Sequence, residues 1–373
     1  MNDDAALILE SVDELVRDVV APRAREIDAS GAFPRDVYDA FARLGLLAAV
    51  IPAEHGGVEI GLETTMLVVE RLAAASASCA LLLGNCGDGV GAIVHGGSHE
   101  QRERVLPGVA DGSLVPCFCL TEPGAGSDAA ALEATARRDG DRFRITGTKR
   151  YITNGSVGDV FTVWARTEAG ISAFLVDGDL AGLSVVRDDD LLGLRGVPAT
   201  ELRFEDTPAE LLGTEGEGFR LAMVTLDDAR LNISACALGT ARGALQIALD
   251  HARTREAFGQ PIIRHQGLAF LLADVVTELA AARALWLEAI RAVAAGAGRV
   301  AATQCAMAKN ACCAAAMRAT TEAVQVLGGA GLTRDVPVER MFRDAKTFQI
   351  LDGTTQIQQL IIARHLERHG LPL

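Results

Sequence analysis

A single aspartate near the carboxyl end of the chain has surroundings that suit chemistry, in the run Ile350-Leu-Asp-Gly-Thr354. Apolar neighbours disfavour an ionised carboxylate, so we expect the pKa of Asp352 to rise toward the working range of a general base. Gly353 predicts a break between two helical segments, with the carboxyl in the connecting loop. An ordinary turn or helix-ending aspartate is the alternative interpretation.

Two glycines and two hydroxyls lie in the run Leu120-Thr-Glu-Pro-Gly-Ala-Gly-Ser-Asp128. Such a run exposes backbone N–H groups beside Thr121 and Ser127, which suits a loop that grips a polar heteroaromatic ring or an anion. It lacks both the G-x-x-x-x-G-K-[ST] phosphate loop and the G-x-G-x-x-G dinucleotide fingerprint. A nicotinamide or ATP site therefore has no support here, and a structural turn is the alternative.

An aromatic ring and a hydroxyl lie two residues apart in the run Gly147-Thr-Lys-Arg-Tyr-Ile-Thr-Asn154. Strand alternation places Tyr151 and Thr153 on one face, where the pair can stack on a flat cofactor and hydrogen-bond to it. An ordinary half-buried strand is the alternative interpretation.

A guanidinium and an aromatic ring come together in the run Arg253-Thr-Arg-Glu-Ala-Phe-Gly-Gln260, which leads to His265-Gln266. An arginine in such a turn can bind a pyrophosphate while Phe258 covers a ribose or a ring. A solvated helix end is the alternative.

A run of charges alternates in sign over two helical turns near the carboxyl end: Glu339, Arg340, Arg343, Asp344 and Lys346. We interpret this run as a ladder of charges on the protein surface.

The elements that must position these residues change character twice along the chain. Apolar residues at helical spacing fill residues 7–112, and short runs with period two fill residues 116–208. Helical spacing returns after Gly218, and length suggests four helices there. We therefore predict a mainly helical α+β protein with an N-terminal helical domain (1–115), a central antiparallel β-barrel-like domain (116–220) and a C-terminal four-helix bundle (221–373).

Composition excludes several classes of protein. The chain has 373 residues, 49% of them hydrophobic, and a formal net charge of −14, which argues against a nucleic-acid partner. The eight cysteines form no C-x-x-C pair and have no histidine at zinc spacing, so we expect reduced core residues, no metal and a cytoplasmic protein. The acidic N-terminus is unlike a signal peptide, and no stretch approaches the roughly 18 apolar residues of a membrane span.

The order and spacing of these runs resemble the acyl-CoA dehydrogenase family of flavoproteins over essentially the whole chain. The most specific segments are residues 121–128 and 325–358, the latter containing Gln325-Val-Leu-Gly-Gly-Ala-Gly331. Residues 51–57, 212–219, 226–230 and 360–364 also match. The resemblance implies the three-domain fold predicted above, FAD as cofactor, and assembly as a homotetramer or dimer with FAD near a subunit interface.

The resemblance also implies roles for individual residues. Cofactor contacts would come from Phe118, Leu120, Thr121, Gly126, Ser127, Tyr151, Thr153, Arg255, Phe258, His265, Gln266, Gln325, Gly328, Gly329, Thr354 and Gln356. Several of these, Arg255, Phe258, Gln266, Gln325 and Gly329 among them, would reach the FAD of a neighbouring subunit. Substrate contacts would come from Ser127, Asp227, Arg230, Gly353 and Arg364.

The implied reaction is the α,β-dehydrogenation of an acyl thioester, with Asp352 taking the α-proton and flavin N5 the hydride. An electron-transfer flavoprotein would then reoxidise the flavin. The family commonly has glutamate where this chain has Asp352, and tryptophan where it has Tyr151. In some members the base is instead a glutamate at a second position, which Ala229 occupies in this chain. The shorter side chain implies that the substrate lies closer, as a small, branched or polar acyl group would.

Two alternatives follow from that difference. Some relatives act on substrates bound to an acyl carrier protein, and Asn85, Cys86 and Asp88 look polar for a fatty chain, which suits a hydroxylated or small polar acyl group. A nitroalkane-oxidase-like flavin oxidase is the other alternative, because that relative also uses aspartate at this position. A flavin scaffold without catalysis is a third class of function.

Overall fold

The structure is a computed structural model that describes residues 3–372, without the side chains of residues 3 and 299. The first part is helical: α1 (Asp3–Leu15), a π-helical turn η1 (Val16–Val20), α2 (Ala21–Ser30), α3 (Arg35–Arg43), 3₁₀ turns η2 (Leu47–Val50) and η3 (Ala53–His55), α4 (Leu62–Ala73), α5 (Ala77–Gly96) and α6 (His99–Ala110). Ser98 and Gln101 form a capping box that starts α6.

α5 is the central helix of this part, and most of its residues are buried. By length and composition it is apolar enough to cross a membrane, so the expectation that no stretch would qualify was wrong on those two criteria. However, 78% of the qualifying window is buried inside the protein, as in the core helix of a globular domain.

The second part is a closed sheet of β1 (Pro116–Cys119), β2 (Thr135–Asp139), β3 (Arg142–Thr153), β4 (Val160–Thr167), β5 (Gly170–Asp177), β6 (Leu183–Asp188) and β7 (Ala199–Leu212), with one 3₁₀ turn, η4 (Ala129–Ala131). Pairing runs from β4 through β2, β3, β7 and β5 back to β4, which closes a small barrel. The predicted antiparallel pairing holds for most strands, but β4 pairs in parallel with both β1 and β2. The long excursion through β2 and β3 brings the chain back beside β1 in the same direction.

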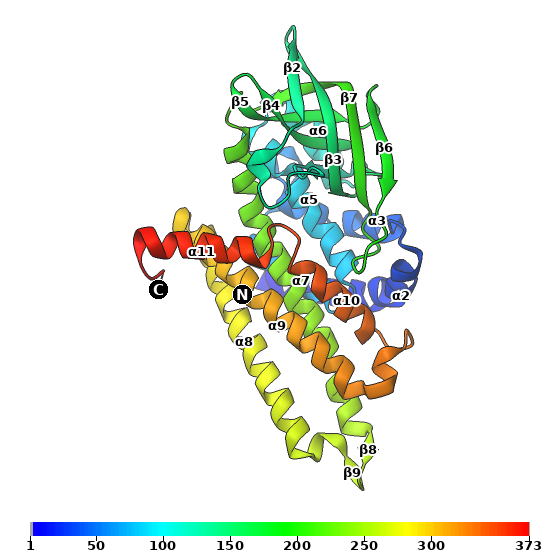
Figure 1. Cartoon of the computed structure of the whole chain (residues 1–373). Coiled ribbons are helices and arrows are strands. Elements are labelled where there is room, and N and C mark those ends of the chain that lie inside the picture. Colours follow the sequence, from blue (N-terminus) through cyan, green and yellow to red (C-terminus); the bar gives the residue numbers. More distant parts are fainter. Residues whose placement is uncertain (1–2, 373) are drawn as a thin grey trace.

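The third part is helical again: α7 (Gly218–Thr254), the hairpin β8 (Glu256–Ala257) and β9 (Gln260–Pro261), η5 (Ile262–Arg264), α8 (Gln266–Ala294), α9 (Arg299–Leu327), η6 (Gly328–Leu332), α10 (Val338–Phe348) and α11 (Thr355–His369). α7, α8 and α9 form the long core of a bundle, and α10 packs on α7 and α9 as a shorter fourth helix. Figure 1 shows the β8–β9 hairpin at the end of this bundle that is distant from the strand domain.

Most of the charges on α10 connect the three parts of the chain, and of the five only Lys346 is exposed. Arg340 and Asp344 are buried, and the Asp344 carboxylate accepts a hydrogen bond from the backbone N–H of Leu194. Arg343 donates to both carboxylate oxygens of Asp28 in α2, at 2.9 and 2.7 Å. The surface interpretation was wrong because sequence spacing shows which charges share a helix face and does not show what covers that face.

Candidate active site

The loop that carries Asp352 connects α10 to α11 and has an unusual backbone. α10 ends at Phe348, and the Thr354 side chain caps α11 by accepting from the N–H of Ile357. Asp352 has φ +49° and Gly353 has φ +89°. A positive φ is uncommon for a residue with a side chain and persists where the surroundings over-determine it, often at functional sites. The predicted break between two helices is therefore present, with a strained aspartate in it.

A buried lysine from α9 holds this loop in place. The Lys309 ammonium donates to the carbonyl oxygens of Leu351 and Gly353, both at 2.6 Å. Lys309 is only 1% exposed, so these bonds lie away from water. The Gln358 side-chain amide also donates to the Gly353 carbonyl at 2.8 Å. The two carbonyls on either side of Asp352 are thus fixed, and the direction of its side chain is fixed with them.

The electrostatic surroundings of Asp352 suit a proton acceptor. Burial raises the pKa of Asp352 above its usual value, and the positive charges of Lys309 and Arg230 offset only part of that rise. Burial also lowers the pKa of Lys309, against the opposing effect of Asp352 and a neighbouring thiol. The prediction of a raised pKa is in agreement with this direction, although the structure shows that lysine and arginine moderate it.

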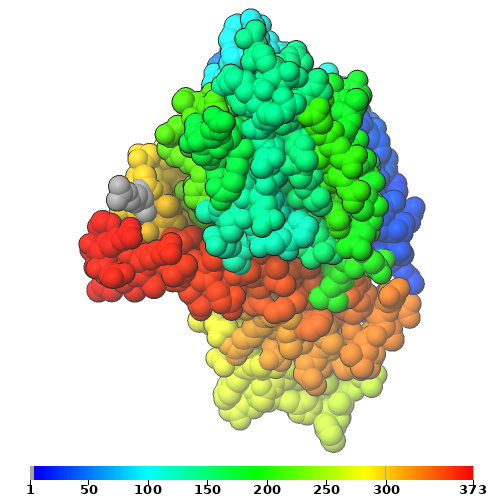
Figure 2. Space-filling model, turned by 45° about the horizontal axis from the view of Figure 1, so that its top comes forward, coloured from blue at the N-terminus to red at the C-terminus, as the bar shows by residue number. Residues whose placement is uncertain are grey.

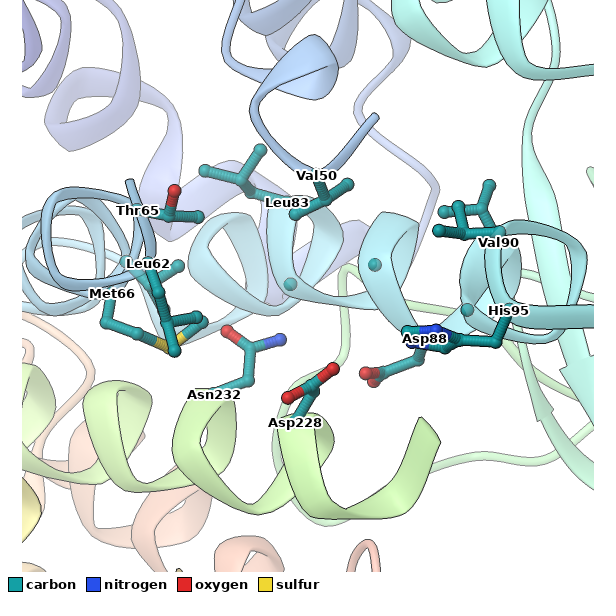
Figure 3. Close-up of a pocket in the computed structure, with 15 residues that line it drawn as sticks. Val50, Leu62, Thr65, Met66, Leu83, Asp88, Val90, His95, Asp228 and Asn232 are labelled. Carbon is teal, nitrogen blue, oxygen red and sulfur yellow. The ribbon is translucent and has the colours of Figure 1, made fainter. Parts of the chain in front are cut away.

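A cavity of about 110 Å³ opens between α4, α5 and the start of α7. Apolar side chains form one wall, among them Leu62, Met66 and Leu83. Asp88 and Asp228 lie on the other wall and face each other from α5 and α7 (Figure 3). The field of Asp352 raises the pKa of Asp88 in addition to the larger effect of burial, so this cavity lies within electrostatic range of the candidate base.

The Gly-rich loop at residues 120–128 is held by a second buried lysine. The Lys149 ammonium donates to the Leu120 carbonyl at 3.1 Å and to the Glu122 carboxylate at 2.7 Å. Lys149 is 0% and Glu122 6% exposed. Glu122 in turn accepts from the backbone N–H groups of Glu133 and Ala134. The loop is therefore anchored to β3 and to the segment that enters β2.

Replacing Lys149 by methionine is expected to destabilise the protein by about 3 kcal/mol, because the buried Glu122 carboxylate loses its counter-charge. Chemical denaturation of the purified protein measures this loss. Lys346→Met is the matched control, since Lys346 is exposed and bonds only to Gln349 on the same helical segment. Equal stability of the two variants would contradict the role given to Lys149.

The residues predicted to contact a flavin lie on this loop and the adjacent strands. The Thr121 carbonyl accepts from the N–H of Arg150, which joins the loop to β3. Tyr151 is 52% exposed with φ +58°, and the register of β3 shifts between Lys149 and Ile152. Simple alternation therefore does not hold at Tyr151, because a bulge re-aims its ring. Phe118 lies against the Trp164 ring, with centroids 4.4 Å apart.

These residues suit FAD in the chemistry of their free groups. Between residues 3 and 372 no hydrogen bond is recorded to the hydroxyls of Thr121, Ser127 or Thr153, so all three are free for a ligand. Leu120 is buried, and Gly126 has open space where a side chain would lie. Figures 1 and 2 both show the α10–α11 segment, which carries Asp352 in its loop, beside the strand domain.

The remaining predicted cofactor residues gather at the other end of the bundle. Arg255, Gly328 and Gly329 line a cleft of about 420 Å³ where α7 ends and η6 begins. Phe258 is at the tip of the β8–β9 hairpin, 97% exposed, with its ring edge-on to His265. Gln266 and Gln325 are also exposed. The single chain therefore forms two separate clusters and does not bring all the predicted cofactor residues together.

The predicted substrate residues are similarly divided. Arg230 is 6% exposed and pairs with Asp227 one turn earlier in α7, while its Nε is buried without a partner in the described structure. Arg364 and Gln356 are exposed on α11. Gly353 needs its positive φ, and a side chain there would also collide with the Gln358 amide, at 2.8 Å.

Sequence reasoning missed four residues that the structure brings to these sites. Lys149 and Lys309 were given no role, yet the chain has only three lysines, and two of them are buried against candidate loops. That scarcity was an available signal. Asp228 and Asn232 face the acyl-sized cavity from α7, and nothing local in the sequence distinguishes them from other polar helix residues.

Comparisons with known proteins agree with this geometry. The family patterns "Acyl-CoA dehydrogenase, N-terminal domain", "middle domain" and "C-terminal domain" match residues 2–113, 117–207 and 216–367. A cyclohex-1-ene-1-carbonyl-CoA dehydrogenase of Geobacter metallireducens is 42% identical over 98% of each chain.

Two solved structures share the fold. A chain described under "Electron transferring flavoprotein of Acidaminococcus fermentans" is 36% identical with a TM-score of 0.96, covering 99% of each chain. Butyryl-CoA dehydrogenase of Megasphaera elsdenii is 32% identical with a TM-score of 0.95, again over 99% of each chain. The chain therefore belongs to the acyl-CoA dehydrogenase family.

Proposed function

We propose that this protein is an FAD-dependent acyl-CoA dehydrogenase that introduces a double bond next to the thioester carbonyl. The observation that carries the proposal is the strained loop that holds Asp352, which Lys309 fixes by its flanking carbonyls in the α10–α11 segment beside the strand domain. The comparisons favour CoA thioesters and do not favour a carrier-protein substrate or a nitroalkane oxidase.

Asp352 is proposed as the base that removes the α-proton. A thioester α-hydrogen is too weakly acidic for a carboxylate in water, so the carbonyl must be polarised by donors that the site holds in place. The backbone N–H at the catalytic loop is such a donor, and Lys309 fixes that loop. Asp352 is about 1.5 Å shorter in reach than glutamate, so the acyl group must approach α10 more closely.

FAD, when bound, supplies the acceptor for the hydride from the β-carbon. Phe118, Leu120, Thr121, Gly126, Ser127, Tyr151 and Thr153 are proposed to hold its ring from the strand domain. Thr354 and Gln356, at the start of α11, are proposed to complete the grip on its pyrophosphate and adenosine. Asp227, Arg230, Gly353 and Arg364, with Ser127, are proposed to line the path of the thioester.

The adenosine end of FAD is proposed to be held by a neighbouring subunit. Arg255, Phe258, Gln266, Gln325, Gly328 and Gly329 are exposed, and they lie at the end of the bundle distant from the candidate base; His265 supports the hairpin that carries Phe258. α8 also leaves Phe270 60% and Val276 54% exposed, as expected of a helix that packs on another copy. A homodimer or homotetramer would complete the site.

Three further proposals accompany this function. An electron-transfer flavoprotein is proposed as the electron acceptor, in keeping with the similarity to the Acidaminococcus fermentans structure.

The eight cysteines are free and buried, which suits the proposed cytoplasmic location. The domain boundaries 1–115, 116–220 and 221–373 remain our proposal.

Anaerobic titration of the purified holoprotein with a panel of acyl-CoA thioesters tests the function. Loss of the flavin's long-wavelength absorbance with at least one thioester is the expected result. Oxygen consumption with nitroalkanes and no response to any thioester would overturn the proposal.

The rate of flavin reduction is expected to rise with pH, because Asp352 accepts a proton only when ionised. Burial raises its pKa, so the midpoint should lie above the ordinary aspartate value of about 3.9. Stopped-flow reduction across a pH series measures the midpoint. A rate that does not change between pH 4 and neutrality, while the protein stays folded, would contradict a raised pKa.

A further inference from the structure

The cavity between α4, α5 and the start of α7 has one polar wall whose groups lack partners. Asn232 is 4% exposed, and its side-chain oxygen has no hydrogen-bond partner in the described part of the chain. Asp88 is 9% exposed, and its carboxyl likewise receives no hydrogen bond from residues 3–372. Asp228 also has no such bond within that range. All three line the cavity and lie in a row between α5 and α7 (Figure 3).

Leaving these groups without partners becomes costly once a bound acyl group covers them and excludes water. A buried polar group without a hydrogen bond is destabilised relative to one that is satisfied. A purely hydrocarbon acyl group would cover all three groups without bonding to any of them. A substituent that both donates and accepts hydrogen bonds would satisfy them.

The close packing of the two helices keeps Asn232 in position. A side chain at Gly84 of α5 would lie 1.8 Å from the Asn232 amide nitrogen, so this glycine lets α7 approach closely. The amide is therefore confined between the helices and the cavity. Its position does not depend on a flexible loop.

The volume of the cavity and the ionisation of its carboxyls narrow the class of acyl substituent that can bind there. The cavity of about 110 Å³ is somewhat smaller than the roughly 150 Å³ cavity that holds benzene, so it suits a short chain or a small ring. Burial, with the fields of Asp352 and Asp228, raises the pKa of Asp88 well above its usual value, and burial raises that of Asp228 to about 6. Both shifts favour the uncharged carboxyl, which can donate as well as accept a hydrogen bond, and so favour a hydroxyl over an ammonium group as the partner.

We infer that Asp88, Asp228 and Asn232 form a hydrogen-bonding end of the acyl pocket that selects a short or cyclic acyl-CoA carrying a hydroxyl group away from the thioester. This inference rests on the proposed function, because it assigns the acyl part of that same substrate. It gives the three residues a recognition role, while Asp352 remains the base.

The test compares two pairs of thioesters on the holoenzyme: cyclohexane-1-carbonyl-CoA with its 4-hydroxy derivative, and butyryl-CoA with 4-hydroxybutyryl-CoA. We expect kcat/KM to favour the hydroxylated member of at least one pair by at least about 100-fold, because a site built to bond a hydroxyl leaves its own groups unpaired with the analogue. Asp88→Leu and Asn232→Leu should reduce this ratio at least tenfold. Asp88→Asn, which keeps hydrogen-bonding capacity, should retain most of it.

Asp141→Asn is the matched control, since Asp141 is exposed in the β2–β3 turn and should leave the ratio unchanged. Flavin reduction by unsubstituted thioesters, with no preference for either hydroxylated one, would overturn the inference and leave the dehydrogenase function standing. Loss of all turnover in Asp88→Asn, with FAD bound and the fold intact, would also overturn it, because Asp88 would then act in bond breaking. No reduction by any thioester would overturn both proposals.

Discussion

Asp352→Asn is expected to slow flavin reduction by an acyl-CoA substrate by about 10³–10⁴-fold, the contribution typical of a positioned general base. The amide has the size of the carboxyl but accepts no proton, so binding of substrate and FAD should change little. Anaerobic stopped-flow reduction measures the rate, and the bound flavin spectrum shows that the cofactor remains.

A second readout separates proton transfer from hydride transfer. Exchange of the substrate α-proton with deuterium from solvent, followed by NMR, should be lost in Asp352→Asn because no other carboxyl is assigned to that carbon. Undiminished reduction in this variant would show that Asp352 is not the base. The neighbouring carboxyl of Asp88 would then be the group to replace next.

Lys309→Met is expected to lower kcat by about 100-fold with a smaller effect on KM. Methionine keeps the length and fills the space, but it cannot donate to the carbonyls of Leu351 and Gly353, so the loop loses the bonds that fix Asp352. A misplacement of about 1 Å at a reacting group is enough for a loss of this size. Steady-state kinetics on the holoenzyme measure both constants.

The pH profile distinguishes positioning from a merely structural effect. The positive charge of Lys309 lowers the pKa of Asp352 in the intact protein. Removing that charge should therefore shift the midpoint of the rate profile upward. Lys346→Met, at the exposed third lysine, should change neither kcat nor the midpoint. An unshifted midpoint and an unchanged kcat in Lys309→Met would refute the positioning role.

The sequence alone was sufficient to predict the types of secondary-structure element and to identify the order of the motifs. Helical spacing, period-two alternation and glycine breaks are local properties, so the helical, strand and helical parts, the barrel-like domain and the break at Gly353 were predicted correctly. The family was also recognisable, because its motifs occur in order over the whole chain. Free, buried cysteines followed from the lack of paired spacing.

Contacts between distant segments were decided only by the tertiary structure. The parallel pairing of β1 with β4, the bulge at Tyr151 and the burial of Arg340 and Asp344 all depend on what packs across from each residue. The same holds for the division of the cofactor residues between two ends of the bundle. A local pattern carries no information on a partner that lies a hundred residues away.

The site shows this division most clearly. The sequence identified Asp352 and the glycine after it, together with the difference from the family's usual glutamate. The structure added Lys309, which reaches the loop from α9, and Asp228 and Asn232, which face Asp88 across the cavity. Lys309 is 43 positions from Asp352, and Asp228 is 140 positions from Asp88. Only folding brings their charges and hydrogen-bonding groups close enough to act on Asp352 and its substrate.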